Sequence, residues 1–75
     1  MDIASSTDFG HLIKEVRISQ GMTQGELAAA SGTGVRFIVD LEKGKPSCEL
    51  QKVLKVAKML GIRLSATTPN TQEPQ

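Results

Sequence analysis

Two short segments with helical patterns follow each other in this sequence, and only Ser31–Gly34 separates them. The first begins with Thr23 and Glu26, whose side chains can each bind the backbone N–H of the other and so start a helix. The second, Val35–Glu42, has its apolar residues on one side: Phe37, Ile38 and Leu41. Two short helices joined by a tight turn that contains glycine form one supersecondary unit.

Two more helices and one strand are predicted around this pair. The preceding helix, with Asp8 or Thr7 as N-cap and an end at Gly21, has helically spaced apolar residues: Phe9, Leu12, Ile13 and Val16. A helix over about residues 50–60 has one apolar side: Leu50, Val53, Leu54, Ala57 and Leu60. Residues 62–67 then alternate apolar and polar side chains, which is typical of a strand. We therefore predict an all-α domain of four helices followed by one short β-strand.

The chain is one small domain, because 75 residues cannot supply two hydrophobic cores. We expect a flexible N-terminus over residues 1–7, the helical domain over 8–61 and the strand over 62–67. Residues 68–75 are rich in polar residues and proline, so we expect a disordered tail there.

Several classes of protein are excluded by what the sequence lacks. Cys48 is the single cysteine and His11 the single histidine, too few ligands for a structural zinc site. No catalytic constellation or phosphate-binding glycine loop is present, so we expect neither an enzyme nor a cofactor. No apolar run approaches the roughly 18 to 20 residues of a membrane helix, and no signal-peptide pattern is found. We expect a cytoplasmic protein.

The net charge of +1 excludes a uniformly basic surface, but the charges are unevenly distributed. Residues 1–33 carry two basic and four acidic side chains, whereas residues 34–75 carry seven basic and four acidic ones. Such asymmetry attracts a phosphate backbone, although a solvated lysine-rich helix face would account for the same residues. On the helix at 35–42, the side opposite the apolar one presents Arg36, Val39, Asp40 and Lys43. A helix that reads the DNA major groove needs one side that packs on the rest of the domain and an opposite side that offers side chains to base edges.

The motifs of this segment are Thr23-Gln24-x-Glu26-Leu27-Ala28, then Gly32, then Ile38-x-x-Leu41-Glu42-x-Gly44. Together they resemble the lambda-repressor-like (XRE, Cro-type) family of helix-turn-helix DNA-binding proteins, over about residues 9–61. A second run is Phe37-Ile38-x-Asp40-Leu41-Glu42-Lys43-Gly44-Lys45-Pro46, followed by an amphipathic helix and a strand in place of a fifth helix. Within the family, this combination is most similar to the HipB-like antitoxins.

The resemblance implies roles for individual residues. Gln24 matches a position that contacts the DNA backbone or supports the reading side chain; a plain helix-start role is the alternative. Arg36 matches a groove position from which it can bind guanine O6 and N7, the alternative being a solvated side chain. Val39 matches another groove position. The alternative is that it is an exposed apolar residue that makes no contact with DNA. The expected DNA-binding set is Thr23, Gln24, Gly34, Val35, Arg36, Val39, Lys43 and Lys45.

Some residues depart from the family pattern or have a structural role in it. Gly34, Val35 and Val39 offer few hydrogen-bonding groups, and Asp40 directs a negative charge toward DNA. These features favour a low-information or shape-dependent operator.

A separate pair, Arg17 and Glu42, matches residues that in the family form a structural salt bridge between the first and third helices.

A lone strand leaves its backbone groups unpaired, so the strand at 62–67 needs a partner. We expect the same strand of a second copy, with four residues at the dimer contact: Leu60, Ile62, Leu64 and Ala66. An irregular tail over the protomer's own domain is the alternative. A two-fold dimer would hold two recognition helices about 34 to 36 Å apart, as a palindromic operator in duplex DNA requires.

The sequence therefore predicts a dimeric repressor of transcription. The resemblance implies the antitoxin of a toxin–antitoxin operon that it autoregulates, with a HipA-like kinase toxin as protein partner. A stand-alone repressor of the phage or restriction-control type is the first alternative. A protein-interaction module without DNA binding is the second.

Overall fold

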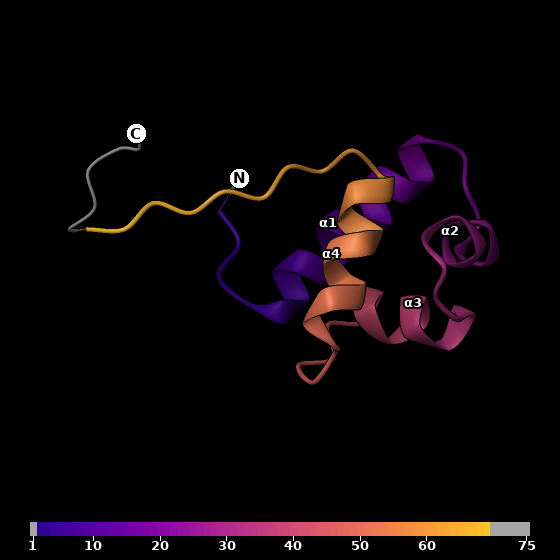
Figure 1. The fold of residues 1–75 in the computed structure, drawn as a ribbon, viewed down its shortest axis with the longest axis horizontal. Helices are drawn as coiled ribbons and strands as arrows, with labels where there is room; N and C mark the ends of the chain where they lie inside the picture. Colours follow the sequence, from indigo (N-terminus) through magenta and orange to yellow (C-terminus); the bar gives the residue numbers. More distant parts are fainter. Residues whose placement is uncertain (1, 70–75) are drawn as a thin grey trace.

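The computed structural model describes residues 2–69 of the chain, and these form four helices joined by short connections (Figure 1). In chain order the helices are α1 (Ser6–Ser19), α2 (Gln24–Ser31), α3 (Val35–Glu42) and α4 (Leu50–Met59). The predicted all-α fold is confirmed, and α3 has the bounds expected from the sequence. Most of the tail predicted to be disordered lies outside the described residues.

Helix α1 begins earlier than its apolar spacing indicates, because Ser5 is its N-cap in place of Thr7 or Asp8. The Ser5 hydroxyl accepts the Asp8 backbone N–H at 3.1 Å, and the Asp8 carboxylate accepts the Ala4 N–H at 3.0 Å. This reciprocal arrangement satisfies two backbone donors that would otherwise lack partners at the helix start.

Helix α2 has the start that the sequence predicts. The Thr23 hydroxyl accepts the Glu26 N–H at 3.0 Å, and the Glu26 carboxylate accepts the Thr23 N–H at 2.8 Å. The helix ends at Gly32, whose φ of 70° turns the chain toward α3 and is available to glycine at little cost. Within this turn the hydroxyls of Ser31 and Thr33 lie 3.0 Å apart in a hydrogen bond, so the polar Thr33 is satisfied.

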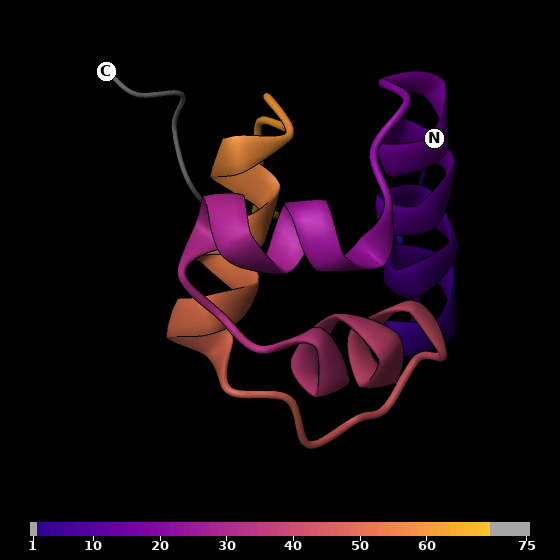
Figure 2. The same cartoon turned by 90° about the vertical axis from the view of Figure 1, so that its right-hand side faces the viewer.

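The two central helices cross between the two outer ones, as Figure 2 shows, with α1 and α4 upright on either side. Helix α3 packs against α1 and α2, and α2 also packs against α4. The small Ala28, on α2, is buried in the core that these contacts enclose. The buried core residues come from all four helices and the turn after α4: Ile13, Leu27, Ala28, Ile38, Leu41, Val56 and Leu60.

Two glycines let α1 and the end of α3 approach each other closely. A Cβ atom on Gly10 would lie 2.4 Å from the Leu41 carbonyl oxygen. Gly44 has a φ of +85°, and a Cβ atom there would lie 2.7 Å from the Thr7 Cα. The Ser6 hydroxyl also donates to the Gly44 carbonyl at 2.7 Å. These contacts hold the C-terminal end of α3 closely against the first turns of α1.

Residues 62–67 form no strand in the part of the chain that the structure describes. After α4 they continue as an extended segment leading away from the helices (Figure 1). Residues 2–69 contain no strand with which this segment could pair, so pairing would require a second copy. The strand and its pairing across a dimer therefore stay predictions.

Candidate nucleic-acid interface

The C-terminal end of α3 is attached to α1 by a buried ion pair. Arg17 Nε donates to Glu42 Oε2 at 2.6 Å, and Arg17 Nη2 donates to Glu42 Oε1 at 3.0 Å. Arg17 Nη1 donates to the Met22 carbonyl at 2.8 Å. The hydrogen bond to Glu42 raises the pKa of Arg17, against the opposing effect of burial, so the guanidinium stays charged. Arg17 and Glu42 thus join the first helix to the third.

Gln24 connects the start of α2 to the same carboxylate. Its amide Nε2 donates to Glu42 Oε1 at 3.1 Å. One of the two amide N–H groups is therefore used inside the protein, which leaves the other available to a ligand. This contact joins the start of α2 to the carboxylate at the end of α3.

The side of α3 that faces away from the core carries the residues predicted to enter the major groove. Gly34, Val35 and Arg36 are exposed, and the Arg36 side chain is 83% accessible to solvent. Val39 is half-buried, so it offers a smaller surface than its sequence position implies. Three further predicted residues are also exposed: Thr23, Lys43 and Lys45.

Asp40, expected from the sequence to direct a negative charge toward DNA, forms two ion pairs in the structure. Its carboxylate is only 22% exposed and lies between two cations. Oδ1 is 3.6 Å from Arg36 Nε, and Oδ2 is 3.5 Å from Lys45 Nζ. The spacing of four residues on one helix could have indicated the Arg36 pair. The Lys45 pair depends on the fold of the loop after α3, which the sequence pattern does not specify.

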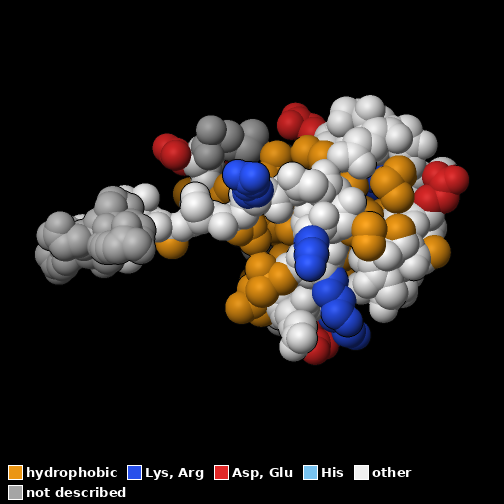
Figure 3. Space-filling model, turned by 45° about the horizontal axis from the view of Figure 1, so that its top comes forward, with side chains coloured by type: hydrophobic (Ala, Val, Ile, Leu, Met, Phe, Trp, Pro, Cys, Tyr) orange, Lys and Arg blue, Asp and Glu red, His pale blue; other side chains and the backbone are white. Residues whose placement is uncertain are grey.

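The residues predicted at a dimer contact occupy different environments. Leu60 is buried in the core of its own protomer, so it offers no surface to a second copy. Ile62 is half-buried against the same core, whereas Leu64 and Ala66 are exposed. On α4 three large apolar side chains are exposed instead, Leu50, Leu54 and Met59, and the first two lie beside lysines of that helix. Figure 3 shows one face of the molecule on which hydrophobic side chains gather next to a short row of basic ones.

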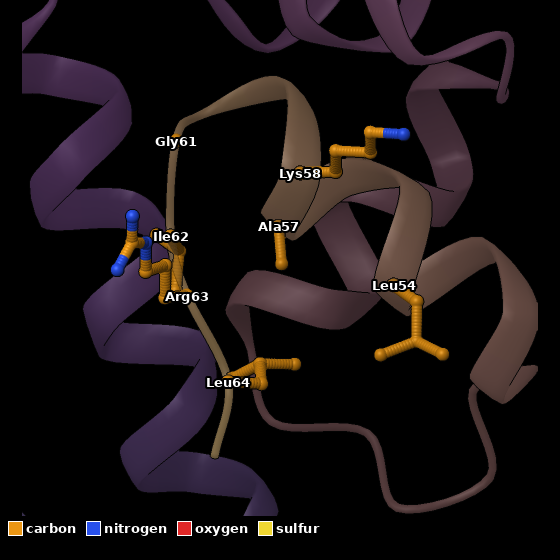
Figure 4. Close-up of a pocket in the computed structure, with 7 residues that line it drawn as sticks. All are labelled: Leu54, Ala57, Lys58, Gly61, Ile62, Arg63 and Leu64. Carbon is orange, nitrogen blue, oxygen red and sulfur yellow. The ribbon is translucent and has the colours of Figure 1, made fainter.

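A groove of about 370 Å³ separates α4 from the extended segment. In Figure 4, Leu64 and Leu54 lie on its two sides with Ala57 between them, and Arg63 points away to the other side of the segment. The alternation that predicted a strand is therefore retained at these two positions: Leu64 faces the groove and Arg63 does not.

The described residues hold no cluster of side chains suited to a metal ion. Cys48 is a free, half-buried thiol, and burial is the largest cause of its raised pKa. Among residues 2–69, no helix is long and apolar enough to span a membrane.

The helix-turn-helix family model HTH_3 matches residues 13–66, which include the whole of α2, α3 and α4. The chain belongs to this family. The resemblance found in the motifs of α2 and α3 is thereby confirmed, because HTH_3 comprises XRE-type helix-turn-helix domains.

Two relatives of this HTH_3 protein are described as HTH-type transcriptional regulators. The regulator y4mF of Sinorhizobium fredii is 45% identical over 67 residues, which cover 89% of this chain and 88% of the relative. One from Archaeoglobus fulgidus is 42% identical over 52 residues, covering 69% of this chain and 74% of the relative.

Solved structures of two kinds share the fold. HipB in the HipB-O4 20mer complex has a TM-score of 0.83 and 26% identity, covering 93% of this chain and 99% of that chain. The same values describe the likeness to a chain in the HipA-HipB-O2-O3 complex. The restriction-modification controller protein C.AhdI from Aeromonas hydrophila has a TM-score of 0.69 and 31% identity, covering 77% of this chain and 84% of that chain. This HTH_3 chain is a member of a family of transcriptional regulators with the four-helix fold of HipB.

Proposed function

We propose that this protein is a dimeric repressor that binds a palindromic operator and autoregulates a toxin–antitoxin operon as its antitoxin. The observation that carries the DNA-binding part is the outward side of α3, which is exposed and held at a fixed angle by Glu42 and Gly10. The antitoxin part is supported by the likeness to HipB, which was solved with operator DNA and with HipA. A HipA-like kinase is accordingly the proposed protein partner.

In this proposal α3 lies in the major groove, and its neighbours bind phosphates. Arg36 binds guanine O6 and N7, while Val35 and the half-buried Val39 contact thymine methyl groups. Gly34 lets the backbone at the start of α3 approach the DNA closely. The Thr23 hydroxyl accepts a bond from its own helix but can still donate its proton to a phosphate. Gln24, Lys43 and Lys45 bind further phosphate oxygens.

Selection of bound fragments from random duplex DNA tests this assignment. We expect a palindrome with two half-sites one helical turn apart. Arg36→Ala should relax the preference at one base pair in each half-site by about 1 to 3 kcal/mol, because a bidentate contact is lost. Lys14→Ala is the matched control, since Lys14 is exposed on α1, outside both α3 and the extended segment, and its selected sequence should be unchanged. An unaltered preference in Arg36→Ala would contradict the role given to Arg36.

Salt dependence distinguishes a DNA-binding protein from a module that binds only proteins. Contacts to phosphates make the logarithm of affinity fall with the logarithm of salt concentration, with a slope of about −0.9 per neutralised phosphate. A protein-interaction module would bind no duplex at any salt concentration.

Dimerisation is proposed to use the extended segment and the exposed side of α4. Residues 62–67 lack a pairing strand within the described chain, and Leu64 and Leu54 remain exposed beside them. Pairing two such segments around a two-fold axis would satisfy their backbone groups and cover Ile62, Leu64 and Ala66. The buried Leu60 would support this contact from inside the core.

Sedimentation equilibrium checks the proposed dimer. The wild type should be dimeric at tens of micromolar, and Leu64→Asp should be monomeric because it places a charge in the apolar contact. Ile18→Asp is the matched control, because Ile18 on α1 is 56% exposed and lies outside this surface, compared with 50% for Leu64. A monomeric wild type, or a dimeric Leu64→Asp, would argue against the contact.

The likeness to C.AhdI favours a second candidate, a stand-alone repressor that controls a restriction-modification system. The two candidates share the DNA contacts and differ in the protein partner. Copurification of a kinase encoded beside this protein would support the antitoxin. A genomic neighbourhood that holds a restriction enzyme and no kinase would support the controller.

A further inference from the structure

We propose that Asp40 is a positioning residue that orients Arg36 toward a guanine and thereby sets the sequence preference of the protein. The inference rests on the proposed function, in which the outward side of α3 enters the major groove. It assigns to Asp40 a role opposite to the simple repulsion of DNA that its charge suggests.

The positions of the two side chains on α3 carry the argument. Arg36 and Asp40 are one helical turn apart, and Arg36 Nε lies 3.6 Å from Asp40 Oδ1. The Asp40 side chain is 22% exposed and the Arg36 side chain 83%, so the acid is the more buried partner and the arginine the one that a ligand can reach. Because the closest approach is through Nε, the two terminal amino groups of Arg36 remain for a base edge. Guanine O6 and N7 accept a pair of donors with this geometry.

Lys45 holds the carboxylate from its other side. Asp40 Oδ2 is 3.5 Å from Lys45 Nζ, and the Lys45 backbone N–H donates to the Asp40 carbonyl at 3.0 Å. The carboxylate is therefore held between a side chain of α3 and the loop that follows it. The three residues together carry a net charge of +1 at pH 7. Their cluster attracts a phosphate backbone even though it contains an acid.

In the free protein this ion pair is exposed to water and contributes little to stability. Bound DNA excludes water from the groove, and the lower local dielectric strengthens the attraction between the carboxylate and the guanidinium. An arginine already restrained by a carboxylate also loses less conformational freedom on binding. The effect of Asp40 is therefore expected in base discrimination rather than in folding.

A double-mutant cycle tests the proposal with four proteins: wild type, Asp40→Asn, Arg36→Ala and the double variant. Each is titrated with the selected operator and with the same duplex changed at the base pair that Arg36 reads. Asp40→Asn should lower the discrimination between the two duplexes several-fold, up to about tenfold, since a bidentate arginine contact is worth about 5- to 150-fold. Its affinity for unrelated duplexes should be unchanged or higher, because a negative charge is removed. In the Arg36→Ala background, Asp40→Asn should not alter discrimination.

Two results would overturn the inference. One is unchanged discrimination in Asp40→Asn. The other is an equal loss with and without Arg36, which would mean that Asp40 itself accepts a bond from cytosine N4. A wild type that selects no sequence would instead refute the proposed function. Circular dichroism verifies that each variant is folded, and Asp40→Ser replaces Asp40→Asn if that variant is unfolded.

Discussion

Glu42→Ala is expected to lower the free energy of unfolding by about 3 to 5 kcal/mol, because it leaves the buried Arg17 guanidinium without its counter-ion. The side chains of the pair are 10% and 4% exposed, so solvent can compensate little. Glu42 also accepts the Gln24 amide, and that bond is lost as well. A domain of this size has a total stability of about 4 to 11 kcal/mol, so this single substitution should remove a large share of it. Urea unfolding followed by circular dichroism measures the change.

The matched control for this experiment is Glu49→Ala. Glu49 pairs with Lys52 at 3.6 Å, but its side chain is 65% exposed, and a surface pair contributes only about 0 to 1 kcal/mol. The double variant Arg17→Met with Glu42→Met should recover part of the stability lost in Glu42→Ala, since no buried charge remains unpaired. Equal unfolding midpoints for Glu42→Ala and Glu49→Ala would contradict the structural role of Glu42.

Gly10→Ala is expected to destabilise the protein by about 1 to 3 kcal/mol or more, although alanine is the better helix former. The added Cβ would lie 2.4 Å from the Leu41 carbonyl oxygen and 2.8 Å from that of Glu42. Both are backbone atoms, so relief requires α3 to move away from α1. Thermal unfolding should show a lower midpoint, and operator affinity should fall because α3 changes its angle.

Gly25→Ala is a control that should change the stability in the opposite direction. Gly25 also lies within a helix, but a Cβ atom there meets its nearest neighbours at 3.9 Å, an ordinary contact. This variant should therefore gain about 0.5 to 1 kcal/mol from helix propensity alone. If the two substitutions change stability by the same amount and sign, close packing of α1 on α3 is not the reason for Gly10.

The parts of the fold that depend on residues close to one another in the sequence could be predicted from the sequence. The reciprocal bonds of Thr23 and Glu26 are local, so their spacing of three residues was sufficient. The bounds of α3 followed from its apolar spacing and from the glycines beside it. The start of α1 was predicted too late because the apolar pattern begins at Phe9, whereas the N-cap is Ser5.

The features that depend on three-dimensional packing could not be predicted in this way. The apolar spacing placed Leu50 and Leu54 on one side of α4 and left Val56 off it, but in the structure Leu50 and Leu54 are exposed and Val56 is buried. Periodicity defines an apolar side but not which of its edges meets the rest of the protein. Ala57 and Leu60, on the same apolar side, are buried. The interhelical contact at Gly10 left no signal other than a glycine inside a helical pattern.

Within the candidate interface, the sequence predicted which residues lie on the outward side of α3 but not how they pair. Arg36 and Asp40 were both placed on that side, and the structure brings them together. The contribution of Lys45 depends on the path of the loop after α3, which Gly44 and its contact with α1 determine.

The core closes within a single chain, since Ile13, Leu27, Ile38 and Val56 are fully buried without a second copy. We therefore expect the domain to fold without association, unlike obligate dimers, so that a folded monomer can accumulate when the protein is scarce. For a dimer that assembles only as its level rises, operator occupancy grows with the square of the monomer concentration. An autoregulated promoter with this dependence would switch off over a narrow range of protein abundance, and changes at Leu64 would shift that threshold without unfolding the domain.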